Sequence, residues 1–162
     1  MSRLQDTIQA IAAAALLREL RDIQRVLVIT PASLKHQWAR EIQTFSDRSA
    51  IVVEGSTAAR SRLYATEGFF KIVNYDVVSR DLDQIQALKV DAIILSTHDE
   101  SAAAPLVKRA VDAGIAVIIV NSDIPNFPAP VHGVVGYSQR RGTYKMGMYV
   151  AGMFHGVAKV GV

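Results

Sequence analysis

Short apolar runs alternate along the chain with longer segments in which apolar residues recur every three or four positions. The short runs predict buried strands at 26–30, 50–54, 69–76, 91–96, 115–121 and 131–137. The longer segments predict helices at 6–23, 33–45, 57–67, 79–89, 101–113 and 139–155. Because strands and helices alternate, we expect a doubly wound parallel sheet with helices on both faces.

The predicted fold class is therefore α/β: a three-layer α/β/α, Rossmann-like arrangement around a mostly parallel sheet of about six strands. A length of 162 residues suits one domain and allows a substantial core, so a single domain over residues 1–162 is expected. Ligands of such sheets bind outside the carboxyl ends of the strands. Candidate binding residues are therefore expected at this edge of the sheet.

Local signals add detail to the helices. Asp6 or Thr7 is predicted to cap the first helix, and Ser33 the second. The face that the first helix buries is expected to comprise Ile8, Ile11, Ala15, Leu16 and Leu20. The methionines of the last helix, which are Met146, Met148 and Met153, are predicted to lie in the core.

Composition excludes several classes of protein. Half of the residues are hydrophobic and 20% are charged, which is typical of a globular domain and argues against disorder. The net charge of +3 is too small to predict nucleic-acid binding by itself. There is no cysteine, so disulfides and thiolate chemistry are excluded. The apolar run at 8–17 is too short to span a bilayer, and no secretory signal pattern precedes it, so we expect a cytoplasmic protein on recombinant expression.

Motifs of known catalytic and metal sites are missing from the sequence. It contains neither of the glycine-rich loops that cradle phosphates, nor a G-x-S-x-G nucleophile elbow. Ser96, His98 and Asp99 lie too close in sequence to form a triad, and Thr97 and Asp99 are expected to cap the following helix instead. The four histidines are scattered. We predict no catalytic residue, no metal and no cofactor.

Two sequence blocks carry a first resemblance. TIQAIAAAALLRELR begins at Thr7, and VLVITPASLKHQWAREIQTF begins at Val26. Together with KIVNYDVVSRDLDQIQAL from Lys71, they make residues 7 to about 90 similar to the first RecA-like lobe of Swi/Snf-type helicase-like ATPases. In that family the T-P-x-S-L-x-x-Q-W block lies near the DNA track. The resemblance therefore implies weak residual nucleic-acid binding through Lys35, His36 and Arg40.

The nucleotide motifs of that family are not retained. Its phosphate loop would occupy residues 3–7, where the sequence is RLQDT, without the glycines and with an acid in place of the lysine. Its acidic box would follow the strand that begins at Asp91, but Ser96 and Thr97 stand there. The resemblance therefore implies that ATP hydrolysis is lost.

A second resemblance covers residues from about 89 to 162. VDAIILSTHDESAAAPLVKRAVDAGIAVIIVNSDIP from Val90 and GVVGYSQRRGTYKMGMYVA from Gly133 are similar to the N-terminal lobe of periplasmic sugar-binding proteins of the ribose and galactose type. This implies that Asn121 hydrogen-bonds a sugar hydroxyl, with Ser122 and Asp123 beside it and Gln139 near the cleft. The chain stops where the second lobe would begin, so we expect any sugar binding to be weak.

The two resemblances meet at Lys89–Leu95, which we call the seam, because both families have a parallel strand there that begins with aspartate. We interpret the chain as an engineered chimera of residues 1–90 and 91–162: a designed scaffold that tests fold recombination, with no natural activity and no enzymatic function. Fragment inheritance places the 26–30 strand beside the strand that begins at Asp91, with 117–121 on its other side. The strands near 50 and 131 would lie toward opposite edges.

Two alternatives remain open at the level of sequence. One is weak binding of a small molecule, sugar or nucleotide, at the carboxyl edge of the sheet through Asn121, Ser122, Asp123, Gln139, His98 and Asp99. The other is weak nucleic-acid binding through Lys35, His36 and Arg40. No specific partner and no membrane are expected, and self-association is left open.

Overall fold

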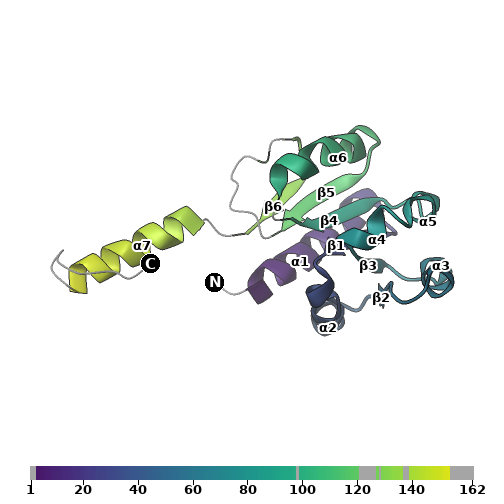
Figure 1. Cartoon of the computed structure of the whole chain (residues 1–162), viewed down its shortest axis with the longest axis horizontal. Coiled ribbons are helices and arrows are strands. Elements are labelled where there is room, and N and C mark those ends of the chain that lie inside the picture. The colour runs from purple at the N-terminus through teal and green to yellow at the C-terminus, as the bar shows by residue number, and fades with distance from the viewer. Residues whose placement is uncertain (1–2, 98, 121–126, 128, 137–138, 154–162) are drawn as a thin grey trace.

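Residues 3–97, 99–120, 127, 129–136 and 139–153 are described by the structure, a computed structural model, and they build one parallel sheet (Figure 1). Its strands are β1 (Val26–Thr30), β2 (Ala50–Val52), β3 (Phe70–Asn74), β4 (Ala92–Ser96), β5 (Ala116–Val120) and β6 (Gly133–Val135). They lie in the order β2-β3-β1-β4-β5-β6, and every neighbouring pair is parallel. The predicted α/β fold class is confirmed.

The strand order also agrees with the order expected from the two segments. β1 pairs with β4, with Val26 opposite Ala92, and β5 lies on the other side of β4. β2 and β6 are the edge strands. The strands of residues 1–90 thus form one contiguous half of the sheet and those of residues 91–162 the other, and the two halves join at the β1–β4 pair.

Helices cover both faces of this sheet. α1 (Arg3–Arg21) and α2 (Lys35–Phe45) pack on one face, and α3 (Thr57–Ala65), α5 (Leu82–Ala87) and α6 (Glu100–Asp112) pack on the other. The short helices η1 (Ala32–Leu34) and α4 (Tyr75–Val78) follow β1 and β3. α7 (Gln139–Met153) lies apart from the sheet (Figure 1).

Side chains of each strand alternate between the two faces, as the period of a strand requires. Val26 and Val28 of β1 join the core under α1 and α2, whereas Leu27 between them joins the core under α3 and α5. Both cores draw on strands from either side of the seam, since Val28 and Ile94 belong to one buried cluster and Ile93 packs against the cluster that holds Leu27. The sheet is therefore packed as one body across the seam.

The first helix differs from its prediction. α1 begins at Arg3, so Asp6 lies within its first turn and neither Asp6 nor Thr7 is its cap. Its buried face is formed by Ala10, Ile11 and Ala14, whereas Leu16 and Leu20 are exposed. The reason is that Leu16 and Leu20 project from the opposite side of the helix from Ala10 and Ala14, which lets the helix backbone approach the sheet.

Two further predictions at helix ends were wrong. Ser33 does not cap α2, because a 3-10 turn precedes the helix, closed by a bond from the Leu34 N–H to the Pro31 carbonyl, and Leu34 becomes the cap residue. The helix predicted at 79–89 is shorter in the structure, where α5 covers only Leu82–Ala87, and α4 at Tyr75–Val78 precedes the predicted range. Asp81 lies between them, and its carboxylate is drawn into a buried ion pair with Arg60.

The methionines of α7 are not part of a core. Met146, Met148 and Met153 are 68%, 59% and 58% exposed, because the helix that carries them lies away from the sheet. The periodicity of a segment predicts a helix with apolar sides, but it does not say what covers them.

The seam is held by the carboxylate of Asp91. Its Oδ2 accepts hydrogen bonds from the backbone N–H groups of Gln24 and Arg25, both at 2.9 Å. The Asp91 N–H in turn donates to the Arg25 carbonyl at 3.0 Å. Asp91 therefore fixes the entry of β1 against the entry of β4.

Asp91→Ala is expected to lower the free energy of unfolding by about 2 kcal/mol, because it removes two hydrogen bonds to a charged acceptor. Chemical denaturation at neutral pH measures this loss. Asp112→Ala is the matched control, since Asp112 makes only an exposed ion pair with Lys108, at 2.7 Å, and its loss should cost less than about 0.5 kcal/mol. Equal losses for the two variants would contradict a special role for Asp91.

Candidate functional site

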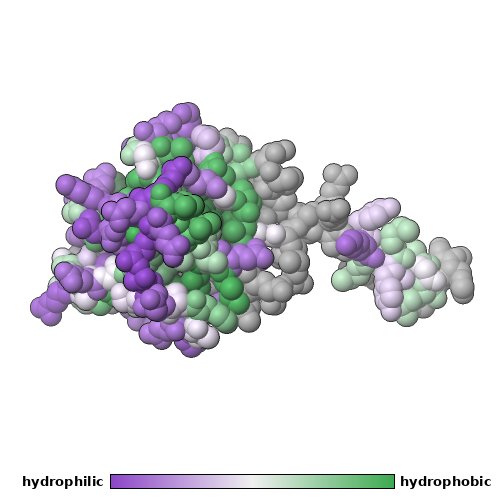
Figure 2. All heavy atoms as spheres, turned by 180° about the vertical axis from the view of Figure 1, so that it is seen from behind, coloured by the Kyte–Doolittle hydropathy of each residue, from purple (hydrophilic) through white to green (hydrophobic). Residues whose placement is uncertain are grey.

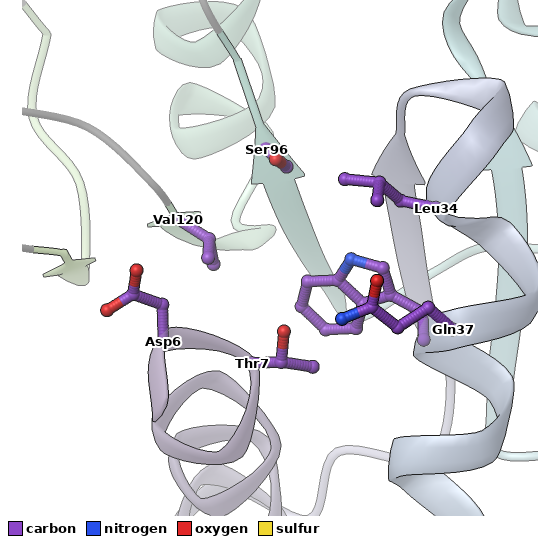
Figure 3. A pocket seen from close by; sticks show the side chains of 7 residues that line it. Asp6, Thr7, Leu34, Gln37, Ser96 and Val120 are labelled. Carbon is purple, nitrogen blue, oxygen red and sulfur yellow. The ribbon is translucent and has the colours of Figure 1, made fainter. Parts of the chain in front are cut away.

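A small cavity lies at the carboxyl edge of the sheet, where β4 and β5 end beside the first turns of α1 and α2 (Figure 3). Its volume is about 20 Å³, which is room for about one water molecule or one hydroxyl group. The lining side chains are Asp6 and Thr7 of α1, Leu34, Gln37 and Trp38 of the α2 region, and Ser96 and Val120 at the strand ends. This is the edge at which doubly wound sheets bind ligands.

Asp6 is the unusual residue of this cavity. It is only 2% exposed, and its Oδ2 atom has no hydrogen-bond partner among the described residues. Burial raises the pKa of the Asp6 carboxyl above its usual range. Because buried polar atoms are nearly always paired, the unpaired carboxyl oxygen of a residue that lines a cavity indicates a missing hydrogen-bond donor.

Other polar groups converge on the same edge. Ser96, at the end of β4, is buried, and Figure 3 shows its side chain and those of Asp6 and Thr7 around one space. Thr30 ends the neighbouring strand β1, and its hydroxyl is also buried without a hydrogen-bond partner in the described part of the chain. Donors and acceptors at this edge thus come from α1 and from two adjacent strands.

On the α2 side, the cavity is lined by an apolar ring and by a side-chain amide that is held in place. Trp38 is buried in the core under α1 and α2 and supplies an apolar surface. Gln37 Nε2 donates to Glu41 Oε1 at 2.7 Å, which orients the Gln37 amide at the rim of the cavity. An apolar surface beside a few oriented polar groups is the usual composition of a small-molecule site.

The residues expected to bind sugar divide into two groups. His98, Asn121, Ser122 and Asp123 lie outside the described residues, but Val120, directly before Asn121, lines the cavity. Gln139 begins α7. Asp99 caps α6, where its Oδ1 accepts from the Ala102 N–H at 2.9 Å, and its own N–H donates to Thr97 Oγ1 at 3.1 Å. The predicted capping role is confirmed for Asp99, whereas Thr97 bonds the backbone of Asp99 rather than an N–H of the helix.

The residues expected to contact nucleic acid do not form one open basic surface. Lys35 is buried, and its Nζ lies 3.2 Å from Glu54 Oε2. His36 Nε2 lies 3.2 Å from the same oxygen, whereas Arg40 is exposed further along α2. The hydrogen bond from Lys35 holds the pKa of Glu54 below its usual range. The Lys35 ammonium is therefore already engaged by a carboxylate.

The cavity lies at the edge of the sheet where candidate binding residues were expected from the sequence, but Asp6, Gln37 and Trp38 were not among them. Asp6 and Thr7 were predicted only as possible caps of the first helix and as part of the segment where a phosphate loop would lie. The position of RLQDT, where a phosphate loop would open, was the signal that this segment lies beside the strand ends.

The described residues contain neither a cluster of metal ligands nor a membrane-spanning helix. Among them no group of three His, Asp or Glu side chains is placed to hold a metal ion. No helix in the same residues is long and apolar enough to cross a membrane.

These features define a doubly wound α/β domain with a candidate ligand site at the carboxyl edge of its sheet. The family model described as a periplasmic binding protein domain matches residues 28–162, and the chain belongs to this family. Domains of the family bind ligands and are not enzymes. The match runs from β1 to the last residue and includes the seam, and a search of curated proteins finds no match.

The family match bears on the second resemblance seen in the sequence. The likeness of residues 89–162 to periplasmic binding proteins is confirmed at the level of the family. The likeness of residues 7–90 to helicase-like ATPases, and the chimeric origin, stay predictions.

Proposed function

We propose that the chain is a binding domain without catalytic activity that takes a small, neutral, hydroxyl-bearing molecule of the sugar class at the carboxyl edge of β4 and β5. The observation that carries this proposal is the buried Asp6 carboxyl: Asp6 lines the cavity, and its Oδ2 has no hydrogen-bond partner in the described residues. A hydroxyl group donates one hydrogen bond and accepts others, so it matches Asp6 as acceptor and Ser96 as donor.

The size of the cavity limits how much of the ligand it encloses. A volume of about 20 Å³ holds one hydroxyl, whereas sites that enclose a whole ligand have several hundred Å³. The remainder of the molecule would then lie against the segment after β5, in which Asn121, Ser122 and Asp123 follow Val120. The enclosing contacts are few, so they only partly offset the free-energy cost of desolvating and ordering the ligand. The affinity should therefore be weak, in the millimolar range.

Anionic ligands fit this site less well. An ionised Asp6 repels phosphate, and the segment at 3–7 lacks the glycines and the lysine that a phosphate site uses. A nucleotide is therefore the weaker choice at this edge. Nucleic-acid binding by α2 has less support too, since Glu54 engages Lys35.

A second candidate is that the domain is a designed scaffold with no ligand, the product of fold recombination. The division of the sheet favours it, because β2-β3-β1 comes from residues 1–90 and β4-β5-β6 from residues 91–162. Under this hypothesis the Asp6 cavity holds a water molecule, which a cavity of this size accommodates. The two candidates differ in whether the edge binds a sugar saturably.

Asp6→Asn tests the proposed site with two readouts of opposite sign. Because burial raises the pKa of Asp6, the folded state binds a proton more tightly than the unfolded state, and its stability falls as pH rises from about 4 towards neutrality. The substitution should remove this fall and stabilise the domain at pH 7 by up to about 1 kcal/mol. It should also weaken sugar binding about tenfold, since a donor amide can replace the acceptor oxygen.

Asp47→Asn is the control, because Asp47 is exposed and pairs only with Arg48 at 3.0 Å. Urea denaturation from pH 4 to pH 8 and calorimetric titration with galactose supply the measurements. A stabilised Asp6→Asn variant that binds galactose as tightly as the wild type would remove Asp6 from the site and leave it as a buried acid only.

A further inference from the structure

A second and much larger cavity lies at the opposite edge of the sheet, where the strands begin. Its volume is about 460 Å³, which is within the range of small-molecule sites. Its lining comes from the end of α1, the turn before β1 and the segments that lead into β4 and β5, and we call it the amino-edge cavity. Because Lys89 and Asp91 of the seam line it, a molecule bound there would contact both halves of the sheet.

The amino-edge cavity combines apolar and charged groups. It lies at the end of the sheet away from α7, since α7 follows β6 at the carboxyl edge (Figure 1), and Figure 2 shows mainly hydrophilic surface on that side of the molecule. Within the cavity, buried Ile23 and partly buried Val90 and Ile115 supply apolar surface beside Arg21 and Lys89. Apolar surface with a few polar groups is the usual lining of a small-molecule site.

The hydrogen-bond acceptors around this cavity already have donors. Asp91 Oδ2 accepts from two backbone N–H groups at the entry of β1. At the end of α5, the Leu88 carbonyl accepts from Arg25 Nη1 at 2.9 Å. The end of α6 is closed by bonds from the Gly114 and Ile115 N–H groups to carbonyls of the helix. These bonds satisfy the negative ends that the helices would otherwise present to a ligand.

The two cationic side chains of the cavity, by contrast, have no counter-ion. Arg21 and Lys89 make no ion pair and no side-chain hydrogen bond within the described part of the chain. Asp22, next to Arg21, accepts instead from Gln24 Nε2, at 2.6 Å. Two cations against the single carboxylate of Asp91 leave the lining with an excess of one positive charge. The group that the cavity lacks is therefore an anion.

The backbone of Lys89 is unusual for a lysine. Its φ is +47°, in the left-handed region that residues with a Cβ atom rarely adopt. Glycine is the common residue at this place after a helix, and Gly114, with a φ of +82°, occupies the corresponding place after α6 and lines the same cavity. A lysine at 89 thus costs stability that a glycine would not, and strain of this kind is concentrated at functional sites.

We propose that the amino-edge cavity is a second binding site, separate from the Asp6 edge, for a small organic carboxylate. The Arg21 guanidinium binds the carboxylate through two N–H groups, and the Lys89 ammonium adds a second positive charge. Ile23, Val90 and Ile115 cover the apolar body of the ligand.

A carboxylate fits this cavity better than a phosphate. Its single negative charge equals the excess positive charge of the lining. Phosphate sites commonly use the backbone N–H groups at the start of a helix, whereas α1, α5 and α6 all end at this edge.

Calorimetric titration of the full chain with benzoate, an apolar ring that carries one carboxylate, tests the site. The wild type should bind benzoate with a dissociation constant in the millimolar range, because a ligand of this size makes few contacts. Benzyl alcohol has the same ring without the charge and should bind at least about tenfold more weakly. Asp6→Asn, at the other edge of the sheet, should leave the benzoate constant unchanged.

Lys89→Gly gives two readouts of opposite sign. Glycine relieves the left-handed backbone, so the melting temperature should rise by up to about 4 °C. The loss of the ammonium should raise the benzoate dissociation constant about tenfold. Asp22→Gly is the matched control, because Asp22 also has a positive φ, of +54°, but does not line the cavity. It should not weaken benzoate binding.

Arg21→Gln should raise the benzoate dissociation constant at least about tenfold, since it removes the guanidinium. Its control is Arg62→Gln, an exposed arginine of α3 that does not line the cavity, and benzoate binding should then stay as in the wild type.

Four results would overturn the proposal. The first is the absence of saturable heat with benzoate up to about 20 mM. The second is a Lys89→Gly or Arg21→Gln variant that binds benzoate as tightly as the wild type, which would leave these residues as helix ends only. The third is benzoate binding that Asp6→Asn abolishes, which would place benzoate at the carboxyl edge. The fourth is tighter binding of inorganic phosphate than of benzoate, which would assign the cavity to a different anion.

Discussion

Arg60→Met is expected to lower the free energy of unfolding by about 3–5 kcal/mol, because it leaves a buried carboxylate without its charged partner. Arg60 and Asp81 are 7% and 2% exposed. The guanidinium binds the carboxylate with both arms, Nε to Oδ2 at 2.6 Å and Nη2 to Oδ1 at 2.8 Å. Nη1 also donates to the Gly55 carbonyl at 2.8 Å. The pair thus ties α3 to the turn between α4 and α5.

Chemical denaturation at pH 7 measures this loss, and two further variants serve as controls. Arg62→Met, an exposed arginine of the same helix, should change stability by less than about 0.5 kcal/mol. Arg60→Met combined with Asp81→Leu should recover much of the loss, because no charge is then left unpaired. A single Arg60→Met variant as stable as Arg62→Met would show that the pair contributes nothing.

The ion pair between Arg60 and Asp81 also makes the stability of the domain depend on pH, in a direction that follows from the pKa of Asp81. Arg60 holds the pKa of Asp81 below its usual range. The stabilisation is therefore complete above the unfolded pKa of about 3.9 and is lost as pH falls through the folded value. Below pH 4 the wild type should lose more stability than Arg60→Met does.

Ile94→Ala is expected to cost about 2–5 kcal/mol and to do so in one cooperative transition. Ile94 lies in β4, is fully buried, and shares a cluster with Ile11 of α1, Val28 of β1 and Ile118 of β5. The truncated side chain leaves a cavity between elements from both sides of the seam. If residues 1–162 form a single domain, both halves must lose stability together.

Two probes separate this outcome from independent halves. The fluorescence of Trp38, the only tryptophan, reports on residues 1–90, and far-ultraviolet circular dichroism reports on the whole chain. Both midpoints should shift equally, whereas Leu106→Ala, an exposed leucine of α6, should shift neither. A fluorescence midpoint that stays in place while the dichroism midpoint falls would contradict a single domain.

The strands were predictable because each is a short apolar run that must be buried on both faces. β1, β4 and β5 lie within the predicted ranges, and their order was inferred correctly. The helix ends were less predictable. A 3-10 turn at Ala32–Leu34 displaced the predicted cap Ser33, and the helix predicted at 79–89 begins only after Asp81, which is held in a buried ion pair. Tertiary contacts decided both, and local patterns do not contain them.

The edge of the sheet that holds the cavity was predictable, but most of the residues that line the cavity were not. Polar residues after strands pointed to the carboxyl edge, and Ser96 and Val120 line the cavity there. Asp6 comes from α1, far away in sequence, and only the packing of α1 on the sheet shows that it lines the same cavity as Ser96. For α7, periodicity predicted the helix correctly but assigned Met146, Met148 and Met153 to a core that does not contain them.

Isothermal titration calorimetry of the wild type with galactose, ribose and ATP-magnesium tests the proposed function most directly. Binding at the Asp6 edge predicts saturable heat with at least one of the sugars, with a dissociation constant of about 1–10 mM, and none with ATP-magnesium. The absence of saturable heat with both sugars up to about 50 mM, several times that constant, would contradict it and leave the scaffold without a ligand.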